Sequence, residues 1–330
     1  SHNWSATCWD DLNNSASSST RSFTVDSTSP TFSAINVTSG TQKSGNLVWA
    51  NFTASEALLS DPNVTIGGQP ATKSSSGGNS YYYNRTLNDT ETEGTATVSI
   101  TGSDLAGNSG TNNTSTISTD FTAPTFPSIN VTSSPATNLS LVWVNFTVSE
   151  TLQSDPAVTV GGQSATKFSN TSNSYKYTRI LNGAETEGTA TVLINGTDLA
   201  GNVGTNNSSS ITTDFTTPTL PAVTISSSNS NTSRAKVGDS ITVNITASEA
   251  ITAPTVTIAG QSATVTTVSS TNYRANYTMQ SNDTEGQVNF SISSYADLAG
   301  NTGATVTAIT NGTNVTFDKT SPTFSSINVT

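Results

Sequence analysis

The sequence predicts an all-β chain of tandem antiparallel β-sandwiches, about seven strands each, in an elongated array. Two observations predict this fold. Apolar and polar residues alternate with a period of two over short stretches, as half-buried strands require, and no stretch has helical periodicity. Two short strings of residues also recur at a nearly constant interval, which indicates one small domain per repeat.

The repeat is defined by these two strings. Asp-Leu-Ala-Gly-Asn occurs at Asp104–Asn108, Asp198–Asn202 and Asp297–Asn301, and Asp-x-Thr-x-Pro-Thr begins at Asp26, Asp120, Asp214 and Asp318, which are 94, 94 and 104 residues apart. The spacing predicts domains at residues 27–120, 121–214 and 215–318, flanked by the end of a domain at 1–26 and the first strand of another at 319–330. In the N-terminal fragment we align Asp11 with Asp104. The offset frame favours a window cut from a longer chain, and the alternative is terminal strands exchanged between subunits.

Repeat one shows the strand pattern most clearly. We expect strands near residues 33–38, 47–55, 64–66, 71–74, 81–87, 95–101 and 114–121. The residues predicted to face inward on three of these strands are Ile35, Val37, Val48, Ala50, Phe52, Ala54, Ala96, Val98 and Ile100. Turns fall at glycine-rich positions such as Gly67-Gly68. The count and spacing of strands fit an antiparallel sandwich.

Composition excludes several classes of function. The net charge of −11 leaves no basic patch for nucleic acid, and no apolar run is long enough to span a bilayer. His2 and Cys8 are the only residues of their kinds, which is too few for acid–base or nucleophilic sites repeated over three domains. We therefore expect no enzyme activity. Cys8 is interpreted either as half of a disulfide to a strand before residue 1 or as an inert thiol.

Several short strings resemble a known family. They are Thr53-Ala54-Ser55-Glu56, Gly68-Gln69-x-Ala71-Thr72, Glu93-Gly94-x-Ala96-x-Val98, Asp104–Asn108 and Asp120-x-x-x-Pro124-Thr125. They resemble the Ig-like repeats of bacterial and archaeal surface adhesins and surface-layer proteins, over all three repeats and both fragments. The resemblance implies Ig-like sandwiches and an extracellular, cell-surface location. Such repeats serve as stalks, filaments and binders alike, so the resemblance does not choose among these roles.

Acceptor sites for N-glycans are unusually frequent. Asn-x-Ser/Thr occurs at 24 of 34 asparagines, where about 12 are expected by chance from the 115 Ser and Thr residues. In Asn51-Phe52-Thr53 the alternation turns Asn51 outward if Phe52 is in the core, as an acceptor needs. The alternative is that outward strand faces use Asn and Thr for polarity alone. The predicted acceptors are Asn36, Asn51, Asn84, Asn88, Asn130, Asn145, Asn195, Asn244, Asn276, Asn289, Asn314 and Asn328. Covalent N-glycans of this kind suit archaea and eukaryotes, and the repeat family favours an archaeon.

Two tryptophans share the outward face with acceptor asparagines. Trp49 and Trp143 stand two residues before Asn51 and Asn145, and repeat three has Thr242 at this position. Three interpretations remain open. The indole packs on the first sugar, it anchors a contact with a neighbouring chain, or a loop covers the strand. The predicted interface residues are Trp49 and Trp143.

Acidic residues fall where the repeat places its loops. The loops after the second strand and before the last share one end of a sandwich with the start of the first strand. This end would gather carboxylates that suit Ca²⁺, as the resemblance also implies, although each Asp could serve only a turn. The predicted ligands at the domain junctions are Asp26, Glu56 and Asp104; Asp120, Glu150 and Asp198; and Asp214, Glu249 and Asp297. Asp61 and Asp155 would join the first two sets, and Ala253 near that place makes the third site the weakest.

Two functions fit these observations. The first is a structural, N-glycosylated extracellular repeat protein that forms part of a cell-surface filament, fibre or stalk, with copies of itself or neighbouring surface proteins as partners. The second is an adhesin for attachment between cells or to surfaces, with strand exchange between subunits as one form. Three similar domains without a long, aromatic-rich loop favour the first.

Overall fold

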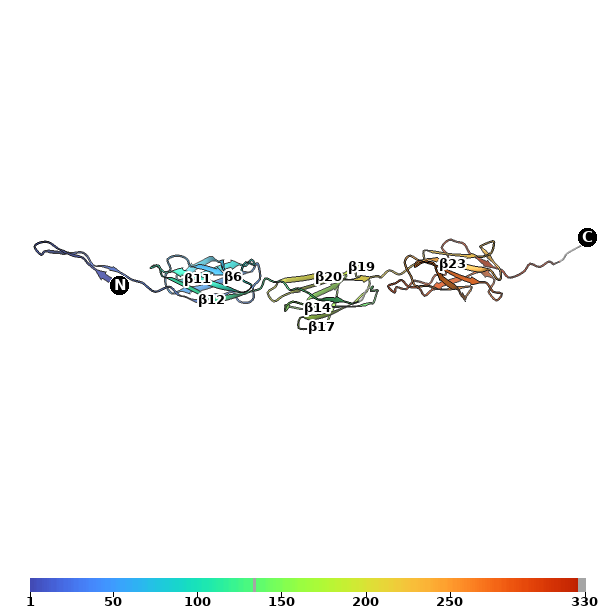
Figure 1. Cartoon of the computed structure of the whole chain (residues 1–330), viewed down its shortest axis with the longest axis horizontal. Helices are drawn as coiled ribbons and strands as arrows, with labels where there is room; N and C mark the ends of the chain where they lie inside the picture. The colour runs from blue at the N-terminus through green and yellow to red at the C-terminus, as the bar shows by residue number, and fades with distance from the viewer. Residues whose placement is uncertain (133–134, 326–330) are drawn as a thin grey trace, which may run out of the picture. The chain divides into compact units, whose positions relative to one another are not determined.

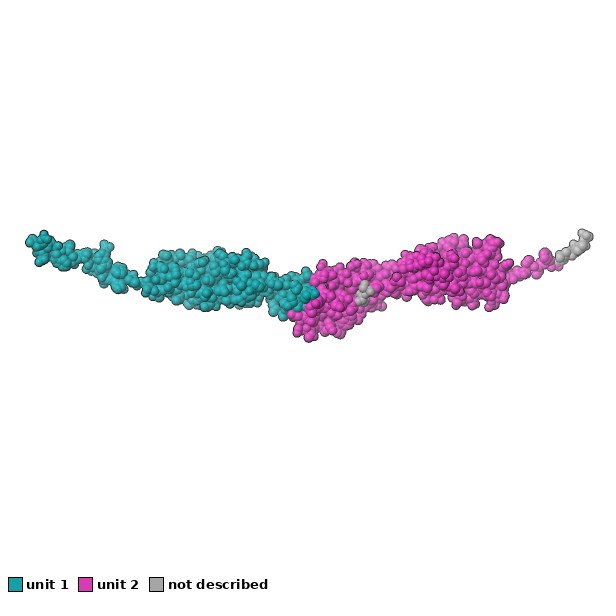
Figure 2. Space-filling model, viewed as in Figure 1, with its two compact units in different colours: residues 1–127, 148–156, 195–205 teal, residues 128–147, 157–194, 206–330 magenta. Residues whose placement is uncertain are grey.

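The computed structural model describes residues 1–132 and 135–325. Every regular element in these residues is a β-strand, so the predicted all-β fold is confirmed as tandem Ig-like antiparallel sandwiches (Figure 1). No helix in the described residues has the length and apolar character needed to cross a membrane. The chain divides into two compact units, one of residues 1–127, 148–156 and 195–205, the other of residues 128–147, 157–194 and 206–330 (Figure 2).

Repeat one lies entirely in the first unit and forms two four-stranded sheets. Their orders are β5-β6-β10-β9 and β12-β11-β7-β8. The strands are β5 (Phe32–Val37), β6 (Leu47–Ala54), β7 (Asn63–Ile66), β8 (Gln69–Pro70), β9 (Thr72–Gly77), β10 (Ser80–Thr86), β11 (Gly94–Ser103) and β12 (Ser109–Thr119). Consecutive pairs of strands alternate between the two sheets, whose inner faces enclose one core.

The core of repeat one contains most of the predicted inward residues. All four on β6 and all three on β11 are buried, with Val48, Ala50, Ala96 and Ile100 fully so. On β5, Ile35 and Val37 are half-buried and pack against the core as predicted, while Phe32, just before the predicted start of the strand, is fully in the core. The register of β5 against β6 shifts after Ser33, so the alternation changes phase there.

Repeat two repeats this architecture and contributes to both compact units. Its sheet orders are β13-β14-β18-β17 and β16-β15-β19-β20. The strands are β13 (Ile129–Val131), β14 (Leu141–Thr147), β15 (Ala157–Val160), β16 (Gln163–Ser164), β17 (Thr166–Thr171), β18 (Ser174–Ile180), β19 (Gly188–Thr197) and β20 (Val203–Thr213). Alternate residues of β14 point into the core, as their equivalents on β6 do; they are Val142, Val144 and Phe146.

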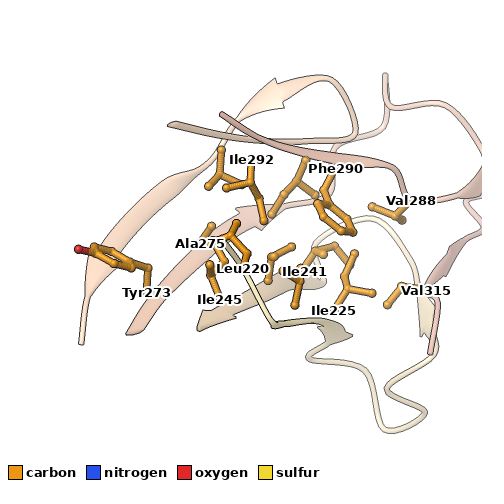
Figure 3. Packing of buried hydrophobic residues seen from close by; sticks show 14 of the residues in the cluster. Leu220, Ile225, Ile241, Ile245, Tyr273, Ala275, Val288, Phe290, Ile292 and Val315 are labelled. Carbon is orange, nitrogen blue, oxygen red and sulfur yellow. The ribbon is translucent and has the colours of Figure 1, made fainter. Parts of the chain in front are cut away.

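Repeat three belongs to the second unit and departs from the other two. Its sheets are β21-β23-β27-β26, β25-β24-β29 and β22-β30-β28. The strands are β21 (Ala222–Ser227), β22 (Arg234–Ala235), β23 (Ser240–Thr246), β24 (Thr255–Ile258), β25 (Gln261–Ser262), β26 (Thr264–Thr267), β27 (Asn272–Thr278), β28 (Gly286–Gln287), β29 (Phe290–Ser293) and β30 (Thr316–Phe317). Ile241, Ile245, Phe290 and Ile292 pack together between the sheets (Figure 3).

The terminal segments lack a core of their own. β1 (His2–Trp4) pairs with β4 (Arg21–Phe23), and β2 (Thr7–Trp9) pairs with β3 (Ser15–Ser17), with every residue of 1–29 exposed. Residues 319–325 form no strand, and the rest of the predicted strand at 326–330 lies outside the described residues.

The junction prolines have a packing role. Pro30 is buried, and its carbonyl oxygen lies so close to Gly110 that a Cβ there would be only 1.8 Å away. Pro124 and Gly204 make the same approach in repeat two. The first residues of repeats one and two therefore pack against the last strand of the same repeat. No residue larger than glycine fits at Gly110 or Gly204.

Candidate functional site

One end of each sandwich is built by the loop after the second strand and the turn before the last. In repeat one, Leu58 forms an isolated bridge with Asp104, and the N–H of Leu59 donates to the carbonyl of Ser103 at 2.8 Å. The equivalent bridges join Leu152 to Asp198 and Ile251 to Asp297. We call this end the acidic end of each repeat.

The Asp-Leu-Ala-Gly-Asn turn encloses its aspartate. Oδ1 of Asp104 accepts hydrogen bonds from the N–H groups of Ala106 and Asn108 at 2.9 Å, and Oδ2 accepts one from Nδ2 of Asn108 at 2.8 Å. Gly107 has a φ of +93°, a left-handed conformation that glycine adopts without strain. Asp198 and Asp297 are held in the same way by Asn202 and Asn301.

The structure brings each predicted set of three carboxylates together. In each set, one oxygen per residue lies within 4.8 Å of the others. The sets are Asp26, Glu56 and Asp104; Asp120, Glu150 and Asp198; and Asp214, Glu249 and Asp297. The member from the turn is almost fully buried, and the glutamates are half-buried.

The charges within each set act on one another. Loss of solvation, reinforced by the charges of Asp26 and Asp104, raises the pKa of Glu56. The same causes raise the pKa of Glu150 and of Glu249. Hydrogen bonding by Asn108, in contrast, holds the pKa of Asp104 below its usual value. Each glutamate thus stands in negative potential that a bound cation would relieve.

The three sets fit a hard cation by distance and donor type. Ca²⁺ binds oxygen at about 2.3–2.6 Å, so two oxygens on one ion lie at most about 5 Å apart. The 4.8 Å limit within each set meets this condition. Oδ2 of each turn aspartate accepts from its asparagine and keeps a free lone pair, which leaves it able to coordinate.

Two alignments made from the sequence were wrong. Asp61 and Asp155 are not members of the sets, and Asp61 instead pairs with Nζ of Lys73 at 2.6 Å. The reason given for a weaker third site therefore does not hold. In the N-terminal hairpin it is Asp10, not Asp11, that matches the turn aspartate, because Asp10 accepts from the N–H and Nδ2 of Asn14.

Two further carboxylates, which the sequence did not lead us to predict, accept hydrogen bonds from the backbone at the junctions. Glu93 accepts from the N–H of Phe121 at 3.1 and 3.2 Å, and Glu187 does the same for Phe215. Each follows a buried glutamate, Glu91 or Glu185, that pairs with an arginine of its own sandwich. The recurrence of Glu-Thr-Glu in the sequence was the available signal for this feature. The first glutamate is buried and pairs with an arginine, and the second accepts a hydrogen bond from the backbone of the junction.

The predicted glycan acceptors differ in exposure. In the described residues none of them is buried. Asn36, Asn88, Asn130, Asn195, Asn244, Asn289 and Asn314 are exposed, and Asn51, Asn84, Asn145 and Asn276 are half-buried. Asn328 lies outside the described residues.

The two tryptophans face outward in different surroundings. Trp49 is 40% exposed and lies across from Asn84 on β10. Trp143 is half-buried, because Phe168 of β17 packs edge-on against it with ring centroids 4.9 Å apart. Phe168 sits at a register shift of β17, which turns it toward β14. Part of the outward face of repeat two is thus covered by a strand residue rather than by a loop.

The chain is distantly similar in structure to other proteins. No family model and no curated protein matches the sequence. An I-band fragment of titin is 8% identical, with 90% of this chain and 100% of that chain covered at a TM-score of 0.46. A Ca²⁺-stabilized adhesin with which an Antarctic bacterium binds ice is 17% identical, with coverages of 96% and 81% at 0.44. These values limit the likeness to the fold and bear on no function.

Proposed function

We propose that the chain is a structural, N-glycosylated extracellular repeat protein that forms part of a cell-surface filament, fibre or stalk. The observation that supports this most is the binding of the junction dipeptide by both flanking repeats. The carbonyl of Asp120 accepts from Nδ2 of Asn202 at 2.9 Å, while the next N–H, of Phe121, donates to Glu93. Asn301, Asp214, Phe215 and Glu187 form the same arrangement at the next junction.

This arrangement suits a chain that transmits load. A junction whose adjacent backbone groups are hydrogen-bonded from both sides has fewer freely rotating bonds than an open linker. The exposed acceptor sites support a glycosylated outer surface, and no catalytic role is part of the proposal. Trp49, exposed on repeat one, and Trp143 are the proposed contacts with copies of the chain or neighbouring surface proteins.

Calcium at the acidic ends is the finer part of the proposal. Each set would hold one Ca²⁺ between the junction aspartate, the loop glutamate and the turn aspartate, and so fasten the junction to the sandwich that follows it. The closeness of three like charges supports this, since their repulsion destabilises the end without a cation.

Electron micrographs of surface material from the source cells, with gold-labelled antibody against the chain, test the main proposal. The expected result is label at regular intervals along a filament or sheet. Label confined to dispersed single chains contradicts a structural role. If the Trp143→Ala chain assembles like the unchanged chain, Trp143 takes no part in the contact between chains.

A further inference from the structure

The outward face of one sheet in repeat two carries a pocket with polar groups from all four strands or their ends. The sheet β13-β14-β18-β17, which includes the β14 and β17 labelled in Figure 1, holds a pocket of about 500 Å³. Its polar lining comes from all four strands or their ends and includes Ser128, Asn130, Asn145, Ser169, Thr171 and Lys176. Hydroxyl, amide and ammonium groups around one hollow suit a polyhydroxylated ligand, which both donates and accepts hydrogen bonds.

Two acceptor asparagines face each other in this pocket. Asn130 of β13 is the direct cross-strand partner of Asn145 of β14, and each begins a complete Asn-x-Thr sequence. The Cβ atoms of such partners are about 4.5–5.5 Å apart. A sugar ring with its hydroxyls is wider than this spacing, so two N-linked sugars cannot stand side by side on the pair.

Exposure distinguishes the two asparagines. Asn130 is exposed on β13, an edge strand of the sheet. Asn145 is half-buried on β14, with Lys176 of β18 as its other cross-strand partner. A glycosylating enzyme that acts on the folded chain reaches the exposed edge residue more readily than the half-buried central one.

The side-chain oxygen of Asn145, the central asparagine, lacks a hydrogen-bond donor among the described residues. Oδ1 of Asn145 is buried and has no hydrogen-bond partner within residues 1–132 and 135–325. A buried acceptor without a donor is costly, and a nearby sugar hydroxyl would supply one. The equivalent atom in repeat three, Oδ1 of Asn244, accepts from Nε of Arg274 at 3.2 Å. In repeat two the place of that arginine is taken by Lys176.

We propose that Asn130 carries the glycan of this pair, that its first sugar occupies the pocket, and that Asn145 stays unmodified and accepts a hydrogen bond from it. The proposal rests on the N-glycosylation in the proposed function and names the acceptor. The choice of the exposed edge-strand acceptor, without the pocket, extends to repeat one, where exposed Asn36 of β5 faces half-buried Asn51 in the same cross-strand pairing.

Glycopeptide mass spectrometry of the protein from its source tests which asparagine is modified. The expected result is a glycan at Asn130 and Asn36 and none at Asn145 and Asn51. Asn130→Gln should remove one glycan from the peptide, while Thr147→Val, which destroys the other acceptor sequence and keeps Asn145, should remove none. A glycan on both asparagines of one molecule, or on Asn145 alone, overturns the proposal. A chain without a glycan at any acceptor instead overturns the N-glycosylation on which the proposal rests.

Hydrogen exchange tests where the sugar lies. Asn145→Ala should speed exchange in β14 several-fold in the glycosylated chain and have a much smaller effect in the Asn130→Gln background, because only the first chain has a sugar to lose contact with. Exchange in repeat three serves as the control for folding. Equal effects in the two backgrounds would show that the sugar does not contact Asn145 and would overturn its placement in the pocket.

Discussion

Repeats one and three stabilise an equivalent turn, after β10 and after β27, with different side chains. In repeat one, Arg85 on β10 pairs with the buried Glu91, whose Oε2 accepts from the N–H of Asn88. In repeat three the equivalent positions are Tyr277 and Asp283. The tyrosine hydroxyl donates to Asp283, which also accepts from the N–H of Gln280, the equivalent of Asn88. The carboxylate is kept because the turn needs an acceptor. The countercharge is not needed where a neutral donor reaches the carboxylate.

The acidic end, in contrast, is the same in all three repeats. Each has the three-carboxylate set and the asparagine that binds the junction carbonyl. The body of the sandwich thus varies while the acidic end does not, which agrees with the role proposed for the junctions.

Loss of the countercharge should give the largest effect. Arg85→Ala leaves Glu91 buried and unpaired, and should lower the free energy of unfolding of repeat one by about 3–5 kcal/mol. Tyr277→Phe removes only a neutral donor to a charged group in repeat three and should cost about 1.5–3 kcal/mol. Hydrogen exchange resolved by repeat measures both. An Arg85→Ala chain as stable as the Tyr277→Phe chain would contradict the comparison.

Calcium should stabilise all three repeats alike. At a hundred times its Kd, a bound ion adds about 2.7 kcal/mol. Calorimetry with and without chelator should show this gain. Glu150→Gln should remove the gain from repeat two, while Asp61→Asn, outside every set, should leave the gain from calcium unchanged. Binding needs a charged glutamate, so the gain should shrink as the pH falls toward the raised pKa of Glu150. No heat and no thermal shift with calcium would end the calcium part of the proposal.

The junction asparagine should contribute less. Asn202→Ala removes the donor to Oδ2 of Asp198 and to the carbonyl of Asp120, and should cost about 2 kcal/mol. Asn14→Ala is the matched control, because Asn14 makes the same bond to Asp10 in an exposed hairpin. Proteolysis at the junction should increase only for Asn202→Ala. Equal cleavage of both chains would show that the junction is not held by this bond.

The aromatic pair of repeat two should have the smallest effect. Phe168→Ala removes an edge-on contact with Trp143 worth about 0.5–1.5 kcal/mol. Ser74 takes this position in repeat one, so Ser74→Ala, which removes an exposed hydrogen bond from Oγ to the carbonyl of Tyr82 and no aromatic contact, should change tryptophan fluorescence little. Urea titration of both chains, followed by tryptophan fluorescence, checks this. A fluorescence change for Ser74→Ala as large as for Phe168→Ala would contradict the assigned contact.

Much of the fold could be predicted because strand alternation is local. Val48 to Ala54 and Ala96 to Ile100 face inward as their pattern indicates. The alternation pattern does not reveal register shifts: the one in β5 left the burial of Phe32 unpredicted, and the one in β17 left the contact of Phe168 with Trp143 unpredicted. The start of β12 at Ser109 was also missed, since residues 109–113 are polar and have no apolar alternation.

The acidic sets could be predicted because the repeat fixes which loops meet. The exclusion of Asp61 could not, because it depends on Lys73, a residue on another strand that is close only in the fold. The pairing of Asn130 with Asn145 depends likewise on the register between β13 and β14, which the sequence of either strand leaves open.

Force spectroscopy of single chains tests most directly whether each repeat is a separate load-bearing sandwich. The account predicts three unfolding events. Two should each release about 94 residues, or about 310–340 Å of extended chain, and the third slightly more. Two events with lengths that follow the two compact units, or one event for the whole chain, would contradict it.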